Sequence, residues 1–207
     1  MVRAITVSRE YGSGGGAVAR ILGKRLGWQV VDNAVVADIA RSADANPNVV
    51  RLHEESVDAW FHRIMKALWR GGYMGAVARS DAEACDADAI ARLWHRVIEE
   101  SGAIGNCVTV GRGGQCLLQR NPDAFHAHIY APMHDRMERL KSREPAGTDL
   151  AAAALDSDRQ RSGYIRHYFD QDWRNPHLYH LMVNADIGCV AAVETILAAI
   201  DAGVSPA

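Results

Sequence analysis

The sequence near its start runs Arg3-Ala-Ile-Thr-Val-Ser-Arg-Glu-Tyr-Gly-Ser-Gly-Gly-Gly-Ala17, in which a β-branched stretch precedes a polar, glycine-rich loop from Ser8 to Gly16. Apolar residues then recur at helical spacing, at Val18, Ile21, Leu22 and Leu26. Gly27 ends this helix, and Trp28-Gln-Val-Val31 predicts a second strand directly after it. Strand, glycine loop, helix and strand within about thirty residues form a βαβ unit with a right-handed crossover.

The rest of the chain continues the alternation of strands and helices. The further elements predicted are strands at Cys107–Val110, Ala127–Tyr130 and His180–Asn184 and a closing helix at Val190–Ile200. Between residues 34 and 102 the pattern is mostly helical, with breaks at 46–48 and 71–75. Strands that are nearly continuous in apolar residues favour a buried parallel sheet. The predicted fold class is therefore α/β, with five parallel strands and flanking helices.

The composition limits the classes of protein to consider. Of 207 residues, 48% are hydrophobic and 23% are charged, which excludes a disordered chain and allows one sizeable core. The formal net charge of −2 gives no overall attraction to nucleic acid or to an anionic membrane, and no apolar run is long enough for a span. The four cysteines form no CxxC pair, as in proteins with free thiols. We expect a cytoplasmic protein without nucleic-acid or membrane partners.

The glycine loop lies where the first strand meets the first helix, and ligands of parallel sheets bind at the carboxyl ends of the strands. Glycines let several backbone N–H groups point at one anion, and the helix N-terminus adds a partial positive charge. We therefore expect a bound phosphate, although a glycine-rich turn without a ligand has the same composition. The residues assigned to phosphate binding are Ser8, Arg9, Gly12, Ser13, Gly14, Gly15, Gly16 and Ala17.

This loop departs from the phosphate-loop consensus G-x-x-x-x-G-K-[ST]. When Gly12-Ser-Gly14 is set on its later part, the lysine position falls on Gly15, and the hydroxyl position falls on a glycine or alanine after it. The dinucleotide pattern G-x-G-x-x-G is not matched either. The backbone cradle is thus kept without the two side chains that act on phosphate and Mg²⁺. Arg9 and Arg20 are candidates to supply the missing charge.

Basic residues cluster in the second half of the chain. One predicted helix carries Arg136, Arg139 and Arg143 on a single face. On a second helix, Arg161 shares a face with Tyr164 and Tyr168 at the same spacing. Joined by a mobile segment over Glu144–Gln160, these faces would form a lid that clamps phosphates, whereas a solvated basic face would show the same spacing. Arg112 stands between glycines at the end of the third strand, where it can hold a second phosphate.

Together these motifs resemble the cytidylate kinase-like family, P-loop relatives of the nucleoside monophosphate kinases. The matching stretches are Ile5–Gly15, Val31-Asp32, Val110-Gly-Arg112, Ile129–Pro132, Asp158–Tyr164, Asp170–Trp173, Tyr179, Val183-Asn184 and Val193–Ile196. The resemblance implies one P-loop kinase-like domain over residues 1–207, with a core at 1–37 and 103–207. It also implies a helical substrate-binding insertion at about 38–102 and a lid at about 143–162.

The resemblance also implies a function and roles for single residues. Catalytic roles would fall to Arg112, Arg143, Arg159 and Arg161, and acceptor binding to Asp32, Arg112 and Tyr164. The expected reaction moves a phosphoryl group from ATP, with Mg²⁺, to a nucleoside monophosphate. Its activity is expected to be weak or altered, because cytidylate kinases have Gly-Lys-Gly-Thr at Gly14–Ala17. The alternative is a non-catalytic nucleotide-binding, regulatory or interaction protein on a kinase scaffold. The oligomeric state stays open, a homodimer included.

Two further departures from the family pattern concern single positions. The kinase-like branch commonly has an arginine at the place of Gly16, and an acidic residue usually stands at the place of Gly113.

Other residues that could carry chemistry are expected to have structural roles instead. His126 and His128 share a strand face, but no third ligand stands near them at metal spacing, so we expect no metal site. Cys116 is expected to be buried filler rather than a nucleophile, and the tryptophans of the 34–102 stretch are expected to pack in the core.

Overall fold

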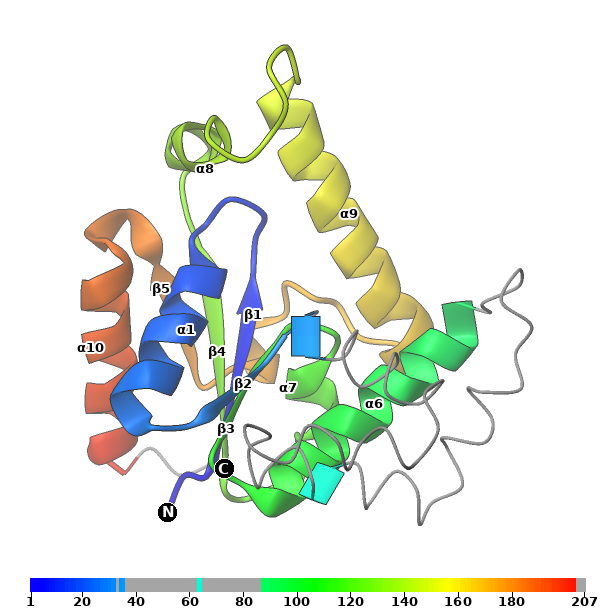
Figure 1. Cartoon of the computed structure of the whole chain (residues 1–207), viewed down its shortest axis with the longest axis vertical. Helices are drawn as coiled ribbons and strands as arrows, with labels where there is room; N and C mark the ends of the chain where they lie inside the picture. Colours follow the sequence, from blue (N-terminus) through cyan, green and yellow to red (C-terminus); the bar gives the residue numbers. More distant parts are fainter. Residues whose placement is uncertain (33, 36–62, 65–86, 204–207) are drawn as a thin grey trace, which may run out of the picture.

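One sheet of five parallel strands organises the protein, and the computed structural model describes residues 1–32, 34–35, 63–64 and 87–203 (Figure 1). The strands are β1 (Ala4–Arg9), β2 (Gln29–Val31), β3 (Cys107–Val110), β4 (Ala124–Tyr130) and β5 (Leu181–Asn184). Their order in the sheet is β2-β3-β1-β4-β5, and every pair of neighbours runs parallel. The predicted five-stranded parallel α/β fold is confirmed.

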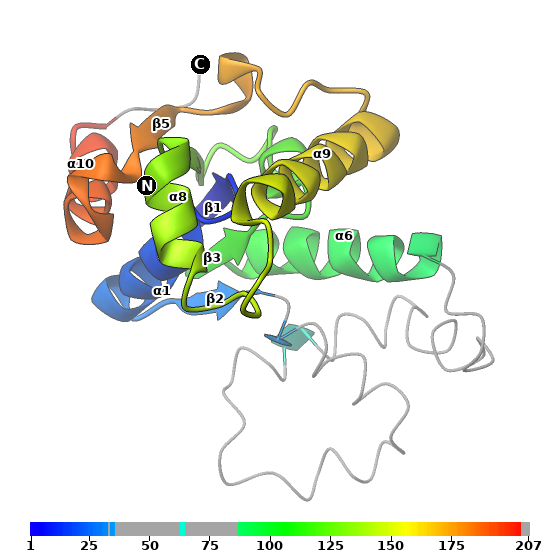
Figure 2. The same ribbon diagram turned by 90° about the horizontal axis from the view of Figure 1, so that it is seen from above.

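Helices cover both faces of this sheet. In the described part they are α1 (Gly15–Leu26), α6 (Ala87–Ile104), α7 (Gly114–Leu117), α8 (Met133–Leu140), α9 (Leu150–Phe169) and α10 (Cys189–Asp201), with 3-10 turns at Pro176–Leu178 and Ala185–Ile187. Seen from above, α1 and α10 lie on one side of the strands, and α6 and α9 lie on the other (Figure 2). The sheet is therefore enclosed between two layers of helices.

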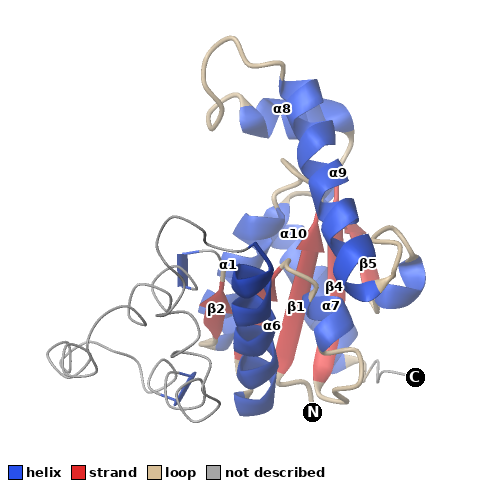
Figure 3. Cartoon of the chain, turned by 90° about the vertical axis from the view of Figure 1, so that its right-hand side faces the viewer, coloured by secondary structure: helices blue, strands red, loops and turns tan. Residues whose placement is uncertain are grey.

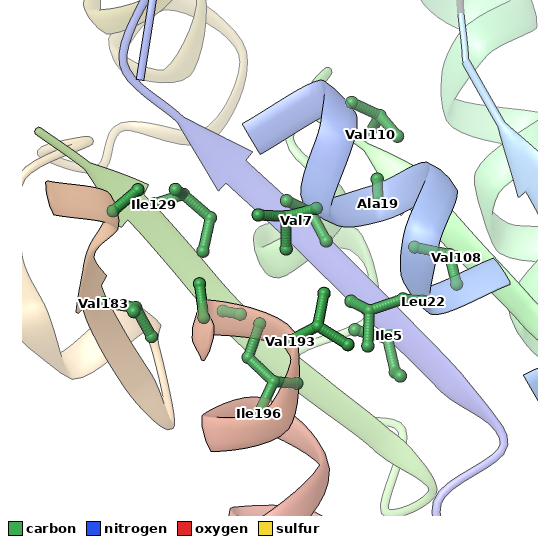
Figure 4. Packing of buried hydrophobic residues seen from close by; sticks show 14 of the residues in the cluster. Ile5, Val7, Ala19, Leu22, Val108, Val110, Ile129, Val183, Val193 and Ile196 are labelled. Atoms are coloured by element: carbon green, nitrogen blue, oxygen red, sulfur yellow. The ribbon is translucent and has the colours of Figure 1, made fainter. Parts of the chain in front are cut away.

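The sheet face toward α1 and α10 is apolar (Figure 4). Because side chains alternate along a strand, Ile5 and Val7 point to this face, and Thr6 and Ser8 point to the other. The buried layer includes Ile5, Val7, Val108, Val110, Phe125, Ile129 and Val183 of the strands and Val18, Leu22, Val193 and Ile196 of the helices. Burying one such side chain contributes about 1.5–3 kcal/mol, so this layer holds α1 firmly against the sheet.

The opposite face carries a polar layer near the carboxyl ends of β1 and β4. Thr6 is paired with His126 and Ser8 with His128 in the parallel register. Thr6 Oγ1 lies 2.9 Å from His126 Nδ1, and Ser8 Oγ lies 3.2 Å from His128 Nδ1. Ser8 Oγ also accepts a hydrogen bond of 2.8 Å from the indole N–H of Trp173. The two histidines therefore share a face, as predicted, and their rings contact hydroxyl groups.

The second basic helix begins earlier than the sequence analysis expected. A mobile segment was expected over Glu144–Gln160, but α9 begins at Leu150. The carboxylate of Asp149 accepts the N–H of Ala152 at 3.0 Å and so caps the helix, and the alanine run that follows has high helix propensity. The expected lid is therefore mostly helical.

Only part of the predicted insertion falls within the described residues. α6 is helical as expected, and Trp94 and Ile64 are buried in one hydrophobic cluster with Val97. This confirms the core role of Trp94. The predicted breaks at 46–48 and 71–75, together with Trp60 and Trp69, lie outside the described residues.

Candidate active site

The glycine loop joins the carboxyl end of β1 to the start of α1, as predicted. Gly12 and Gly14 have φ values of 80° and 90°, a left-handed conformation that glycine adopts readily. Within the described part of the chain, no group accepts a hydrogen bond from the backbone N–H of Gly12, Gly14, Gly15 or Gly16. These N–H groups are therefore available to an anion at the N-terminus of α1.

A cavity of about 360 Å³ opens beside Ser8 and Arg9 at the start of this loop, between the ends of β1 and β3 and the helix α9. Figure 3 shows α9 running past the carboxyl ends of the strands. The lining residues are Ser8 and Arg9 of β1, Gly111, Arg112, Gly113 and Gln115 after β3, Ser157, Gln160, Arg161, Tyr164 and Ile165 of α9, and Trp173. Three arginines from three segments of the chain thus meet at one cavity.

Arg9 is the last residue of β1 and lies beside two glycines. A Cβ atom at Gly15 would be 2.9 Å from Arg9 Cγ, and one at Gly111 would be 3.0 Å from Arg9 Cζ. Burial, together with the charges of Arg161 and Arg112, lowers the pKa of Arg9 to about 10. The guanidinium therefore stays protonated at neutral pH, and it forms no ion pair with a described carboxylate.

Arg112 occupies the turn after β3 in a strained conformation. Its φ is 53°, which is uncommon for a residue other than glycine and costs about 1–3 kcal/mol. The guanidinium carbon lies 5.2 Å from the ring centre of Trp94 and 5.7 Å from that of Tyr164. The Tyr164 hydroxyl is in turn 2.9 Å from His95 Nε2. The aromatic rings thus hold the Arg112 cation at the cavity wall.

Asp158 of α9 connects the glycine loop to α8. Its Oδ1 accepts the backbone N–H of Tyr11 at 2.8 Å and a guanidinium N–H of Arg161 at 3.0 Å, while its Oδ2 accepts from Arg136. Arg136 also donates to the carbonyl of Tyr11 at 2.6 Å and lies 3.4 Å from a carboxylate oxygen of Glu10. Asp158 and Arg136 are both buried. The same carboxylate therefore fixes the loop and orients Arg161.

Three charged residues with predicted roles lie outside the cavity lining. Asp32 follows β2, where its carboxylate accepts the backbone N–H of Ala34 at 3.0 Å. Arg143 is exposed in the turn after α8, and Arg159 is exposed on α9, where it pairs with Asp156. Of the predicted site residues, the structure brings together Ser8, Arg9, Arg112, Arg161 and Tyr164 at the cavity, whereas residues 12–17 of the loop, Asp32, Arg143 and Arg159 do not line it.

Gln115 and Trp173 line the cavity, although neither was predicted as a site residue. Gln115 is buried, and no described group accepts from its side-chain N–H₂, so it offers a donor that a bound ligand could use. Its position directly after the Gly113-Gly114 pair was the available signal. Trp173 belonged to a stretch matched for the resemblance alone, and its contact with Ser8 depends on tertiary packing.

The departures from the consensus have local explanations. A Cβ atom at Gly113 would lie 2.6 Å from Phe169 Cζ, so the end of α9 packs where the acidic residue of other family members would stand. Neither Gly16 nor Ala17 carries the loop hydroxyl that contacts Mg²⁺ in the consensus. In the described ranges, no three His, Cys, Asp or Glu side chains are grouped to hold a metal ion. These residues therefore do not fit a protein-held Mg²⁺ at the loop.

A glycine loop at the end of β1, an arginine at the end of β3 and an arginine-bearing helix above them are arranged as the resemblance implies. Residues 4–187 match the cytidylate kinase-like family. The chain belongs to the cytidylate kinase-like family. No curated protein matches it. Among the described residues of this family member, no helix is both long and apolar enough to cross a bilayer.

Solved structures share the fold of this cytidylate kinase-like chain at low sequence identity. An uncharacterized protein from Eubacterium ventriosum ATCC 27560 is 19% identical, with a TM-score of 0.67 over 97% of this chain and 99% of that chain. Shikimate kinase from Acinetobacter baumannii, in complex with shikimate, is 15% identical, with a TM-score of 0.53 over 98% and 95% of the two chains. A gluconokinase from Sinorhizobium meliloti 1021 is 12% identical, with a TM-score of 0.50 over 98% and 93%. The fold is thus that of P-loop kinases.

Proposed function

We propose that the protein transfers the γ-phosphoryl group of ATP to a nucleoside monophosphate. The observation that carries this proposal is the meeting of Arg9, Arg112 and Arg161 at one cavity, which the start of the glycine loop lines. Farther along the same loop, the N–H groups of Gly12, Gly14, Gly15 and Gly16 have no described acceptor. Phosphoryl transfer needs positioning and neutralisation of charge more than covalent help from the protein. Three guanidinium groups and a helix N-terminus meet that need.

Each phosphate group of the two substrates is assigned to a different part of the site. The N–H groups of Gly12, Gly14, Gly15 and Gly16 would bind the β-phosphate, and Arg112 would bind the phosphate of the acceptor. An acceptor oxygen forms a bond to the γ-phosphorus while the bond to the bridging oxygen breaks, and ADP leaves with that electron pair. Arg161 faces the group in transfer, because Asp158 holds it toward the cavity. Mg²⁺ would enter with ATP rather than on a loop hydroxyl.

The rival function is nucleotide binding without turnover. It is favoured by the absence of a lysine at Gly15 and of a hydroxyl at Ala17. Removing an electrostatic donor from such a site costs about 10²–10³ in rate, whereas backbone N–H groups alone can support ground-state binding. Binding and turnover therefore have to be measured separately.

Isothermal titration with ATP and ADP, beside a coupled assay of ADP release with each nucleoside monophosphate, tests the proposal. We expect nucleotide binding, and ADP release that depends on one monophosphate more than on the others. Binding of ATP with no release above the solvent background would favour the non-catalytic rival. Failure to bind either nucleotide would contradict both functions.

A further inference from the structure

Arg9 and Gly15 stand at the two ends of the phosphate-loop consensus. In G-x-x-x-x-G-K, the second glycine corresponds to Gly14 and the lysine to Gly15, so the first glycine corresponds to Arg9. The chain thus has a basic residue where the consensus has glycine, and glycine where the consensus has a basic residue. The number of basic side chains in the loop pattern is unchanged, and only their position differs.

The geometry explains why these two changes occur together. A Cβ atom on Gly15 would lie 2.9 Å from Cγ of Arg9 and nearer still to its Cβ, a distance that packed side chains do not adopt. The two positions therefore share one space, which can hold a side chain from either residue but not from both. A lysine at position 15 requires glycine at position 9, and an arginine at position 9 requires glycine at position 15.

We propose that Arg9 supplies the cation for the β- and γ-phosphates that the consensus lysine supplies in other phosphate loops. This inference rests on the proposed function, because it assigns a role at the same nucleotide site. Arg9 leaves the end of β1 across Gly111 and reaches the cavity that Arg112 and Arg161 also line. Gly111 has no side chain to obstruct it, and a Cβ there would be 3.0 Å from Arg9 Cζ.

The electrostatic setting of Arg9 suits an anionic ligand. It forms no ion pair with a described carboxylate. Burial and then the charges of Arg161 and Arg112 lower its pKa, and the carboxylates of Asp32 and Asp158 offset this only in part. An anion placed among three cations relieves their mutual repulsion, and the relief is larger for a triphosphate than for a monophosphate. The site therefore favours ligands with several adjacent phosphate groups.

Arg20 is the competing source of charge. It lies on α1, and its Nη1 would be 3.7 Å from a Cβ atom on Gly16, so it is near the loop. Its side chain is exposed, however, and it does not line the cavity. An exposed cation contributes less than a partly buried one because water screens its charge.

The decisive experiment moves the charge back to the consensus position. Arg9→Met removes the cation, Arg9→Lys keeps it, and Arg9→Gly combined with Gly15→Lys relocates it. We expect Arg9→Met to lower kcat by about 10²–10³ and Arg9→Lys to lower it less. The relocation variant should have a kcat at least about tenfold higher than that of Arg9→Met. Arg20→Met should keep a kcat within about twofold of the wild type. Thermal unfolding checks that each variant folds, and Arg9→Gln replaces Arg9→Met where it does not.

A binding measurement separates this inference from the proposed function. The ratio of ADP to AMP affinity reports recognition of the β-phosphate without turnover. Arg9→Met should reduce ADP affinity by about ten- to a hundredfold and leave AMP affinity within about twofold. Equal ratios of ADP to AMP affinity in Arg9→Met and wild type would overturn the role of Arg9 without contradicting the proposed function. Loss of ADP affinity in Arg20→Met instead of Arg9→Met would do the same. A wild type that binds neither nucleotide would remove the proposed function and this role with it.

Discussion

Arg112 shows how a single residue is committed to the site. Its left-handed φ of 53° would be relieved by glycine, yet the chain keeps a long cationic side chain there, between Trp94 and Tyr164. The sequence predicted its location because a strand that ends in Gly-Arg-Gly is a local pattern. It did not predict the contact of Arg9 with Gly15, because two residues six apart meet only if the loop folds back on itself.

Replacing Arg112 by alanine tests its role toward the acceptor. A charge-assisted contact with a phosphate is worth about 1.5–3 kcal/mol, so Arg112→Ala should weaken binding of the preferred monophosphate by about ten- to a hundredfold. ATP affinity should change by less than about threefold. Titration calorimetry measures both, with Arg120→Ala, an exposed arginine outside the cavity lining, as the control. An equal loss for both ligands would contradict the assignment.

At the scale of elements, α9 lines the cavity and contacts the glycine loop. Its start could have been predicted, because Asp149 followed by an alanine run is a capped helix N-terminus. Its packing could not, because the bond from Tyr11 N–H to Asp158 links residues 147 positions apart. Long-range polar contacts of this kind leave no periodic trace in a sequence.

Asp158→Asn should destabilise the protein strongly. Asp158 is 3% exposed and faces both Arg136 and Arg161, and removing one partner of a buried ion pair costs about 3–5 kcal/mol. Asp156→Asn on the same helix removes an exposed pair with Arg159 and should cost about 0.2–1 kcal/mol. Urea unfolding of both variants measures the difference. Equal losses would show that the Asp158 network does not hold α9 to the loop.

For the whole molecule, the sequence predicted five parallel strands with strand ends within a few residues of those observed. Apolar runs and glycine-marked ends are local signals, so β3 matches at both ends. The strand order β2-β3-β1-β4-β5 could not be predicted in the same way, because it depends on which buried faces pair over long distances. The shared face of His126 and His128 could be predicted from their alternation, but their contacts with Thr6 and Ser8 in the polar layer could not, for the same reason.

This polar layer makes stability depend on pH. Burial lowers the pKa of His126 and of His128 to about 4, while in the unfolded chain it is about 6.5. Between these values the unfolded chain binds more protons, so stability is complete above about pH 6.5 and is lost as the pH falls toward 4. From pH 7 to pH 5 the free energy of unfolding should fall by about 2 kcal/mol per histidine.

Urea unfolding at the two pH values measures this loss. The double variant His126→Gln and His128→Gln should be less stable at pH 7 but should lose much less on acidification than the wild type. His134→Gln, which changes an exposed histidine, should leave the loss unchanged. A wild type with the same free energy of unfolding at pH 7 and pH 5 would contradict the burial of neutral histidines.

A crystal structure with a non-hydrolysable ATP analogue would locate the transferred phosphate directly. We expect the β-phosphate on the N–H groups at the start of α1 and a γ-phosphate oxygen within about 3.2 Å of the Arg9 guanidinium. Arg112 should then face the γ-phosphate across the part of the cavity left for the acceptor. An analogue bound away from the glycine loop, or a γ-phosphate beyond the reach of Arg9, would contradict phosphoryl transfer at this cavity with Arg9 as its cation.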